Sequence, residues 1–324
     1  MAAVSCLASG CAGNQNVFNP QGPEARSIAT LGWALLVIAG IVYVVVVATL
    51  FWAMGRRRRE TDMAPETTRT LERNVVAASA VTIVILIVLV FVSVVSGRGL
   101  TSPSGAGAIT VDVIGHQWWW DFRYHDVTPS DVVTSPNELH IPIGVPVVLK
   151  TQSSDVIHSF WVPNLYGKRD LIPGEITNMW IQADKPGVYR GQCAEFCGTQ
   201  HAHMAFVVVA EPMDKFLTWI EHQREPAVEP TSDDARHGHD VFMQGPCVLC
   251  HSIQGTPAGS HVGPDLTHVG SRMLLAAGTL PNTRGHLGGW VANSQSIKPG
   301  NRMPPNDLTP ADLQAVLTYV RSLR

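Results

Sequence analysis

The sequence has no excess of basic residues. It contains 23 Lys and Arg against 26 Asp and Glu, and its formal net charge at pH 7 is -3. A nucleic-acid-binding domain usually carries a basic face and a high isoelectric point. We therefore expect no nucleic-acid partner.

Charged residues are missing altogether from two apolar segments, residues 27–55 and 74–97. Each segment is longer than the ~20 apolar residues that span a bilayer core. A helix buried in a soluble protein would show an amphipathic stripe, whereas residues 43–47 and 81–92 are apolar all round. The sequence predicts a transmembrane helical hairpin over residues 27–97.

The chain between these segments is rich in arginine, with Arg56, Arg57, Arg58, Arg59, Arg69 and Arg73. Short loops rich in Arg or Lys remain on the cytoplasmic side of a membrane. Both termini, and everything after about residue 97, are therefore expected on the periplasmic or extracytoplasmic side.

Lys and Arg are also missing before Cys11, so the first residues lack an ordinary signal-peptide n-region. Residues 7–11, Leu-Ala-Ser-Gly-Cys, nevertheless resemble a bacterial lipoprotein processing site, at which Cys11 would become the lipidated N-terminus. A ragged, unprocessed tail and a misplaced start codon are the alternatives. Residues 1–26 are interpreted as a leader or lipoprotein-like N-terminus.

Beyond residue 97 the sequence pattern changes twice. The small, polar residues 101–107 form a linker to short β-prone runs broken by Pro and Gly, which predict a β-sandwich or barrel within residues 98–224. Residues 225–231 lack periodicity and are expected to link this domain to a helical domain at 232–324. The β-prone runs are 109–114, 138–141, 145–150, 176–181, 187–190 and 205–210.

The helical domain carries its clearest signal near the C-terminus. Thr309 is a candidate N-cap, and Pro310 follows at the first helical position. Apolar residues then repeat at i, i+3, i+4 and i+7, which indicates one packed face. These residues are Leu313, Val316, Leu317 and Val320. An earlier helix is indicated by Ala235, Gly238, Val241 and Phe242.

Only six cysteines are present, and Cys6 and Cys11 lie in the leader. An exported domain can use cysteines as disulfides. The short spacing of the other four argues instead for cofactor ligands. They form two close pairs, Cys193 with Cys197 and Cys247 with Cys250.

The second pair lies in Cys247-Val248-Leu249-Cys250-His251, a C-x-x-C-H pattern. This pattern is the attachment signature of c-type haem, in which both thiols form thioethers and His251 is an axial ligand of the iron. A redox disulfide would require a βαβ context and a zinc site a second ligand pair, and the sequence shows neither. A covalently bound haem c is therefore expected.

A methionine is expected as the second axial ligand. Met303 lies in a Met-Pro loop before the last helix, and this order resembles small bacterial cytochromes c, in which such a Met is the sixth ligand. Met273 is its rival, in an apolar run interpreted as helical, where a Met is more often core filler. A Met ligand leaves no open site for oxygen, so electron transfer is favoured over ligand binding.

The first cysteine pair belongs to a C-x3-C-x3-H-x2-M pattern at residues 193–204. Thiolate, imidazole and thioether ligands select copper or another soft metal. Because a blue copper site contains one Cys, two cysteines predict a site for two copper ions. His158, 35 residues before Cys193, is the expected remote ligand at the edge of the sandwich.

This set of residues is similar to the binuclear CuA centre of cytochrome c oxidase subunit II. With the hairpin and the cytochrome, the whole chain resembles the caa3-type branch of haem-copper oxygen reductases. The resemblance implies a multidomain membrane protein, in which a cupredoxin-like Greek-key β-sandwich lies between the hairpin and an all-α cytochrome c domain. It also implies the CuA ligands: bridging Cys193 and Cys197, His158 and Met204 on one copper, and His201 and the backbone carbonyl of Glu195 on the other.

Further roles follow from the resemblance alone. The Glu195 carboxylate would reach a magnesium ion shared with subunit I, and His203 is not expected to be a ligand. Trp118, in a stretch similar to the family's G-H-Q-W-x-W, is the candidate residue at which electrons enter CuA, whereas packing is expected for either of the next two tryptophans. Glu72 is a candidate for proton uptake, but the family's aromatic and Pro signature does not follow it. A solvated carboxylate at a helix start is the alternative.

The resemblance implies the electron-transfer subunit of a ferrocytochrome c:O2 oxidoreductase in a bacterial inner membrane. Electrons from cytochrome c or a quinol:cytochrome c reductase would pass through haem c and CuA to haem a of subunit I, where O2 reduction and proton pumping occur. Subunits I and III and membrane lipid are the implied partners. The alternatives are a CuA subunit of a nitric oxide or nitrous oxide reductase, and a stand-alone copper-haem redox carrier or copper-storage protein.

Overall fold

The computed structural model describes residues 13–55, 65–98, 109–125 and 132–324. Cys11, the arginines at 56–59 and the linker at 101–107 lie outside these ranges, and the predictions attached to them remain predictions. Within the described ranges, the chain divides into two compact units, residues 26–102 and the remainder. Each unit is described separately below.

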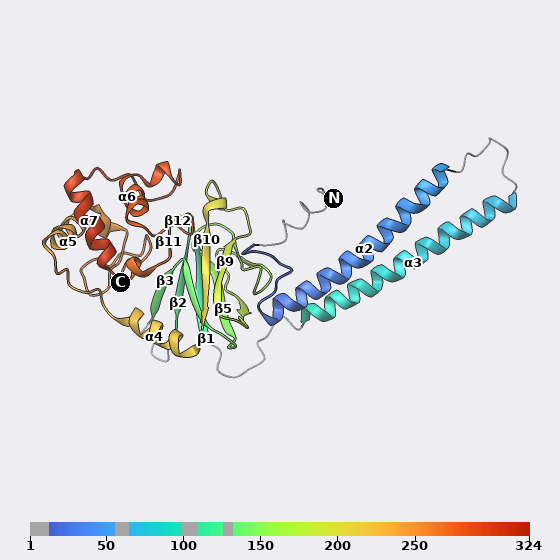
Figure 1. Ribbon diagram of the computed structural model, residues 1–324, viewed down its shortest axis with the longest axis horizontal. Coiled ribbons are helices and arrows are strands. Elements are labelled where there is room, and N and C mark those ends of the chain that lie inside the picture. The colour runs from blue at the N-terminus through green and yellow to red at the C-terminus, as the bar shows by residue number, and fades with distance from the viewer. Residues whose placement is uncertain (1–12, 56–64, 99–108, 126–131) are drawn as a thin grey trace, which may run out of the picture. The chain divides into compact units, whose positions relative to one another are not determined.

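The first unit contains two long helices, α2 (Pro23–Gly55) and α3 (Pro65–Arg98). Both are long and apolar enough to cross a membrane. Their large apolar side chains are exposed, among them Tyr43, Phe51 and Phe91. Such surfaces suit contact with lipid. They agree with the predicted hairpin of apolar helices, drawn in blue and cyan in Figure 1.

Glu72 does not lie at a helix start. Helix α3 begins at Pro65, and Glu66 occupies its first turn. At 3.6 residues per turn, Glu72 falls in the third turn, where the backbone N–H groups are already bonded within the helix. The interpretation of Glu72 as a carboxylate placed at a helix N-terminus is therefore wrong.

The β-domain is a sandwich of two five-stranded sheets, with strand orders β3-β2-β1-β5-β8 and β4-β10-β9-β6-β7. Each sheet is antiparallel except for one parallel pair, β1 with β5 and β10 with β4. The strands of this sandwich are the green to yellow arrows in Figure 1. The strands are β1 (Ile109–His116), β2 (Trp119–Tyr124), β3 (Val133–Pro136), β4 (Glu138–Pro142), β5 (Val147–Ser153), β6 (His158–Trp161), β7 (Arg169–Leu171), β8 (Thr177–Ile181), β9 (Gly187–Cys193) and β10 (Ala205–Glu211).

Aromatic side chains fill the space between the two sheets. Trp120, Phe160 and Phe206 are fully buried, and the ring of Phe206 lies 5.1 Å from that of Trp120 and 4.7 Å from that of Phe160. Gly191 makes room for this cluster, because a Cβ atom there would meet the Phe206 ring at 2.1 Å. Trp120, the last tryptophan of the 118–120 run, therefore packs inside the sandwich.

Residues 13–22 contact the sandwich. The amide N–H of Gln21 donates to the carbonyl of Asn164 over 2.7 Å, and the side-chain amide of Asn164 donates to the carbonyls of Asn16 and Asn19. Asp184 N–H donates in turn to the carbonyl of Gln21 over 2.7 Å. These bonds give residues 13–22 a defined place against the β-domain.

Helix α4 (Met213–Arg224) follows β10 and was not anticipated from the pattern of strands. Phe216 and Ile220 are its buried residues, and the Trp219 ring stacks on His140 of β4 at 4.0 Å. A single apolar face of this kind is enough to hold a short helix against a sheet. Residues 225–231 after it contain no helix or strand.

The C-terminal domain is built from helices α5 (Asp233–Gln244), α6 (Arg284–Ala292) and α7 (Pro310–Ser322), with short 3-10 turns between them. Thr309 caps α7 by accepting a hydrogen bond from the amide of Asp312, and Pro310 is the first helical residue, as predicted. Helices α5 and α7 cross at Gly238, where a Cβ atom would lie 2.0 Å from the carbonyl oxygen of Ala315. This close approach explains the glycine in the predicted apolar face of α5.

Met273 does not lie in a helix. The chain passes from a 3-10 turn (Val269–Ser271) into a two-residue strand (Leu274–Leu275), and the Met273 N–H donates to a carboxylate oxygen of Glu138 over 3.0 Å. The Met273 N–H is therefore not available for a hydrogen bond within a helix. The Met273 side chain is 40% exposed, so the prediction of a core-filling methionine in a helical run is wrong.

Candidate metal centre and haem site

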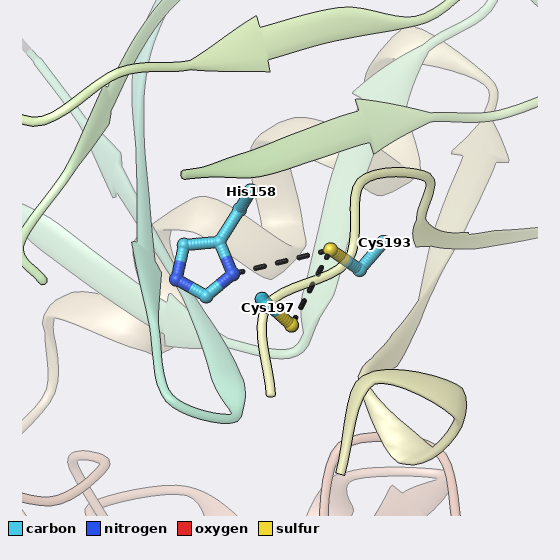
Figure 2. A group of neighbouring side chains, drawn as sticks. All are labelled: His158, Cys193 and Cys197. Atoms are coloured by element: carbon cyan, nitrogen blue, oxygen red, sulfur yellow. Dashed lines mark hydrogen bonds between the residues drawn. The ribbon is translucent and has the colours of Figure 1, made fainter. Parts of the chain in front are cut away.

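Three side chains converge in the β-domain: His158, Cys193 and Cys197 (Figure 2). Their ligand atoms all lie within 4.8 Å of one another, and all three residues are buried. The two sulfur atoms are 3.8 Å apart, and Nδ1 of His158 lies 3.9 Å from Sγ of Cys193. This is a compact set of soft and borderline donors, which suits copper or zinc rather than magnesium or calcium.

Two further predicted ligands complete the cluster. Nδ1 of His201 lies 3.7 Å from the sulfur of Cys197, and Sδ of Met204 lies 3.8 Å from the same sulfur. Met204 is 1% exposed, whereas His201 is half-buried. The carbonyl oxygen of Glu195 lies 3.1 Å from Sγ of Cys193. Every donor named from the sequence pattern thus falls in one place.

The loop between β9 and β10 positions these donors. Cys193 is the last residue of β9, and its N–H donates to the carbonyl of Met204, one residue before β10. His158 is the first residue of β6, which pairs with β9. Strand β6 lies second from the end of its sheet, next to β9. His158 therefore reaches the loop from the strand that neighbours β9.

Asp155 orients His158 and was not singled out from the sequence. Nε2 of His158 donates to Oδ1 of Asp155 over 2.8 Å, while Oδ2 of Asp155 accepts from the backbone N–H of Gln117 over 2.7 Å. Gly115 permits this packing, since a Cβ atom there would meet the imidazole at 2.8 Å. Because Nε2 carries the proton, Nδ1 is unprotonated, faces the thiols and can donate its lone pair to a metal ion. The sequence signal that could have revealed this role of Asp155 is its position three residues before a ligand histidine.

The two thiols titrate as a pair. A hydrogen bond from Cys197 lowers the pKa of Cys193 to about 3, although burial opposes this. The pKa of Cys197 is raised, because it holds its proton in the hydrogen bond to Cys193 and because burial and the Cys193 charge oppose a second thiolate. A divalent or monovalent metal cation removes this repulsion, which is why such a site favours metal over two protons.

The stretch around Trp118 contacts the same loop. Nε1 of Trp118 and the side-chain amide of Gln117 both donate to the carbonyl oxygen of Cys197, over 2.9 and 2.8 Å. Gly198 adopts a φ of +114°, and a Cβ atom there would come within 3.0 Å of the Trp118 ring. Trp118 is therefore directly hydrogen-bonded to the backbone of a cysteine in the cluster.

The Glu195 side chain points away from the sulfur atoms. Its carboxylate lies 3.2 Å from Nζ of Lys168 and is 43% exposed, while Phe196 beside it is 76% exposed. His203 is also turned away, with Nδ1 at 2.8 Å from the side-chain oxygen of Gln200. Neither side chain enters the cluster of donors.

The C-x-x-C-H stretch of the C-terminal domain forms a 3-10 turn (Pro246–Leu249) followed by His251. Nδ1 of His251 donates to the carbonyl of Pro264 over 2.7 Å, which leaves Nε2 available for an iron ion. Burial lowers the pKa of His251 and favours the neutral, ligating form. Gly263 makes room for the ring, because a Cβ atom there would lie 2.8 Å from Cε1 of His251.

Met303 lies in a loop held by hydrogen bonds to its backbone. Its carbonyl accepts from Oγ of Ser294 and from the side-chain amide of Gln295, over 2.6 and 2.8 Å, and its N–H donates to Asn301. The side chain is half-buried and makes no contribution to the main apolar cluster of the domain. These hydrogen bonds fix the Met303 backbone without involving its sulfur atom.

The residues present fit the groups that the sequence suggests. The β-domain offers two thiols, two imidazole nitrogens, a thioether and a carbonyl in one buried cluster, which is the donor chemistry of a copper pair. The C-terminal domain offers two closely spaced thiols, neither in a disulfide, and a histidine with one free ring nitrogen, which is the chemistry of covalent haem attachment.

Fold and site together define a class: a membrane-anchored protein with a copper-binding, cupredoxin-like domain fused to a cytochrome c domain. Comparison with known sequences agrees. The family described as "Cytochrome C oxidase subunit II, periplasmic domain" matches residues 129–211, and the family described as "Cytochrome c" matches residues 235–324. The chain belongs to the cytochrome c oxidase subunit 2 family.

Individual relatives place this match on nearly the whole chain. The chain is 33% identical over 332 residues to cytochrome c oxidase subunit 2 of Alkalihalophilus pseudofirmus, covering 99% of this chain and 95% of that relative. It is 33% identical over 230 residues to the same subunit of Bacillus sp. strain PS3, covering 67% of this chain and 62% of that relative. The predicted fold class and family are thereby confirmed.

A solved structure is also similar to this chain. It is the periplasmic domain of subunit II of cytochrome oxidase from Bradyrhizobium japonicum, at 27% identity and a TM-score of 0.35. The match covers 37% of this chain and 96% of that structure.

Proposed function

We propose that this chain is the electron-transferring subunit II of a caa3-type haem-copper oxygen reductase. It receives electrons from cytochrome c or a quinol:cytochrome c reductase and delivers them to haem a of subunit I. Reduction of O2 and proton pumping take place in subunit I, and subunit III completes the complex. Both redox domains face the outside of a bacterial cell membrane.

The observation that carries this proposal is the convergence of the six donor groups around Cys193 and Cys197. Two thiolates shared between two copper ions would let one electron spread over both metals. Strands β6, β9 and β10 fix both ends of the loop that carries the donors. Little rearrangement is then needed when an electron arrives or leaves.

The proposed assignment of the ligands follows the family resemblance, and the donors lie close enough together to supply it. Cys193 and Cys197 would be shared by the two coppers, His158 and Met204 would serve one, and His201 and the Glu195 carbonyl would serve the other. In the cytochrome domain, Cys247 and Cys250 attach haem c, with His251 and Met303 as axial ligands.

Three further roles belong to the same proposal. Trp118, bonded to the carbonyl of Cys197, is the residue at which electrons reach CuA. The exposed Glu195 carboxylate, which pairs with Lys168, would bind a magnesium ion shared with subunit I. Glu72 takes part in proton uptake through the membrane-facing part of the complex.

Quantifying metal and haem in the native membrane complex tests the proposal. Two coppers and one covalent haem per chain are expected, together with a co-purifying haem-copper subunit I. One copper per chain would contradict the binuclear site. A chain that purifies without subunit I would point to a stand-alone carrier, and a nitric oxide reductase-type catalytic subunit would replace the oxidase assignment.

A further inference from the structure

Lys298 is a buried lysine of the cytochrome domain that bonds to the copper-binding domain. It is 2% exposed. Its Nζ donates to the carbonyl oxygens of Trp118 and His203 over 2.9 and 2.8 Å, and to that of Ala276 over 3.2 Å. Trp118 and His203 belong to the β-domain, whereas Ala276 belongs to the cytochrome domain. One side chain therefore joins three backbone segments.

The number of acceptors matches the chemistry of the ammonium group, which has three N–H donors and no acceptor. Burial lowers the pKa of Lys298 to about 7. Burying an amine costs free energy unless its N–H groups are hydrogen-bonded. A buried polar group with all its hydrogen bonds made therefore favours the one arrangement of its neighbours that provides them. The contact thus selects a particular docking of the two domains.

On the cytochrome side, Lys298 and Met303 lie in one hydrogen-bonded loop. The N–H of Lys298 donates to the carbonyl of Ser294 over 2.8 Å, and the Ser294 hydroxyl donates to the carbonyl of Met303 over 2.6 Å. Asn301 donates to the Lys298 carbonyl and accepts from the Met303 N–H, over 2.7 and 2.8 Å. Fixing Lys298 therefore fixes the backbone of Met303.

On the copper side, both acceptors adjoin the metal cluster. Trp118 is bonded through Nε1 to the carbonyl of Cys197 over 2.9 Å, and His203 immediately precedes Met204. Two further hydrogen bonds between the domains flank the lysine, one from the side-chain amide of Gln200 and one from the backbone of Ala205. Gln200 donates to the carbonyl of Pro299 over 2.7 Å, and the N–H of Ala205 donates to the carbonyl of Ala277 over 2.9 Å.

We propose that Lys298 is a positioning residue for electron transfer between the two centres. It holds the Met303 loop of the cytochrome domain against the Cys197–Met204 loop of the β-domain. This inference rests on the proposed function, because it assumes haem at the first loop and copper at the second. The step is a one-electron exchange in which ferrous haem is oxidised and the oxidised copper pair is reduced, with no bond made or broken.

Lys298→Met tests this role in the intact complex, with Lys215→Met on the exposed face of α4 as the matched control. A soluble ruthenium photoreductant reduces the haem by flash, and the optical bands of haem and CuA then follow transfer between them. We expect Lys298→Met to slow this transfer by about tenfold or more, as small misplacements do. The yield of flash-reduced haem, both optical spectra and the Lys215→Met rate should match wild type.

An unchanged transfer rate in Lys298→Met, with copper and haem both present, would overturn the proposal. Hydrogen exchange in the wild-type complex is a test that needs no variant to fold. The Ala205 amide should be protected, because its acceptor is the Ala277 carbonyl across the junction. Exchange as fast as that of an exposed amide would refute the docking.

Failure of the proposed function shows itself separately. A wild-type complex without copper or haem contradicts the function before any variant is compared. The docking contact is then supported or refuted by exchange at Ala205 alone.

Discussion

Asp155 accepts a hydrogen bond from Nε2 of His158 over 2.8 Å, and this contact decides which ring nitrogen faces the thiols. Asp155→Asn should weaken copper binding, because the amide no longer favours the tautomer with Nδ1 free. Loss of such an outer partner typically lowers metal affinity about 10–100-fold. Copper retention during chelator titration measures this, with Asp214→Asn on α4 as the control. Equal retention in both variants would show that Asp155 is not needed.

Cys197→Ser should remove the copper pair and leave the haem in place. Cys197 lies within 4 Å of Cys193, His201 and Met204 through its sulfur, at 3.8, 3.7 and 3.8 Å, so no other side chain replaces it. The covalent haem attaches in the other domain and is expected at wild-type level. Copper analysis and a denaturing gel stained for haem report the two outcomes. Two coppers retained in this variant would contradict the bridging role.

Met303→Leu should change the ligation of the haem iron, whereas Met273→Leu should not. Met303 lies in the loop bonded to Ser294 and Asn301, while Met273 is 40% exposed and bonded through its backbone to Glu138. A thioether ligand raises the reduction potential of the haem, so its loss should lower that potential. Redox titration and the visible spectrum compare the two variants. If the reduction potential shifted in Met273→Leu and not in Met303→Leu, Met273 would be the haem ligand and Met303 would not.

His140 makes the stability of the β-domain depend on pH. Burial lowers the pKa of His140, but hydrogen bonds to Glu138 and Glu211, at 3.1 and 2.8 Å, outweigh it and leave the pKa raised. Charged His140 therefore stabilises the fold fully below its unfolded pKa of about 6.5 and loses this effect as the pH rises through the folded-state value.

Wild type should accordingly unfold at a higher temperature than His140→Gln. This difference in unfolding temperature should shrink as the pH is raised from acidic to alkaline. Scanning calorimetry of the isolated holo chain at several pH values measures it. The exposed His261 provides the control, through His261→Gln. An advantage that grows with pH would show that His140 is neutral in the folded state.

Gly238→Val should destabilise the cytochrome domain. The new Cβ would lie 2.0 Å from the carbonyl oxygen of Ala315, so α5 and α7 would have to separate. Overpacking of this kind costs about 1–3 kcal/mol. Gly259→Val is the matched control, because nothing lies within 4 Å of a Cβ atom there. Denaturant unfolding followed by the haem absorption compares the two variants.

Much of the molecule was predictable because its signals are local. Helix α7 follows from Thr309, Pro310 and four apolar residues at helical spacing, and the metal cluster follows from residues 193–204 with one remote histidine. Six of the strands coincide with β-prone runs. Strands β3, β6 and β7 have only four, four and three residues, which is too short for a clear pattern, and they were missed.

The contacts that orient the site were not predictable from the sequence. Lys298 bonds to backbone carbonyls, which every residue carries, and its acceptor Trp118 lies 180 residues earlier. Nothing in the polar loop around Lys298 distinguishes it from an exposed lysine. Asp155 had a local spacing to His158, but the bond that fixes it comes from the N–H of Gln117, 38 residues earlier. Such partners depend on tertiary folding.

The junction at Lys298 also changes how electrons reach the copper loop. Two partners linked in one chain meet at an effective concentration on the order of millimolar, whatever the concentration of the protein. Encounters between separate charged proteins, by contrast, slow steeply as salt is added. Transfer across this junction should therefore be independent of dilution and nearly insensitive to ionic strength, and only the arrival of electrons from an outside donor should respond to either.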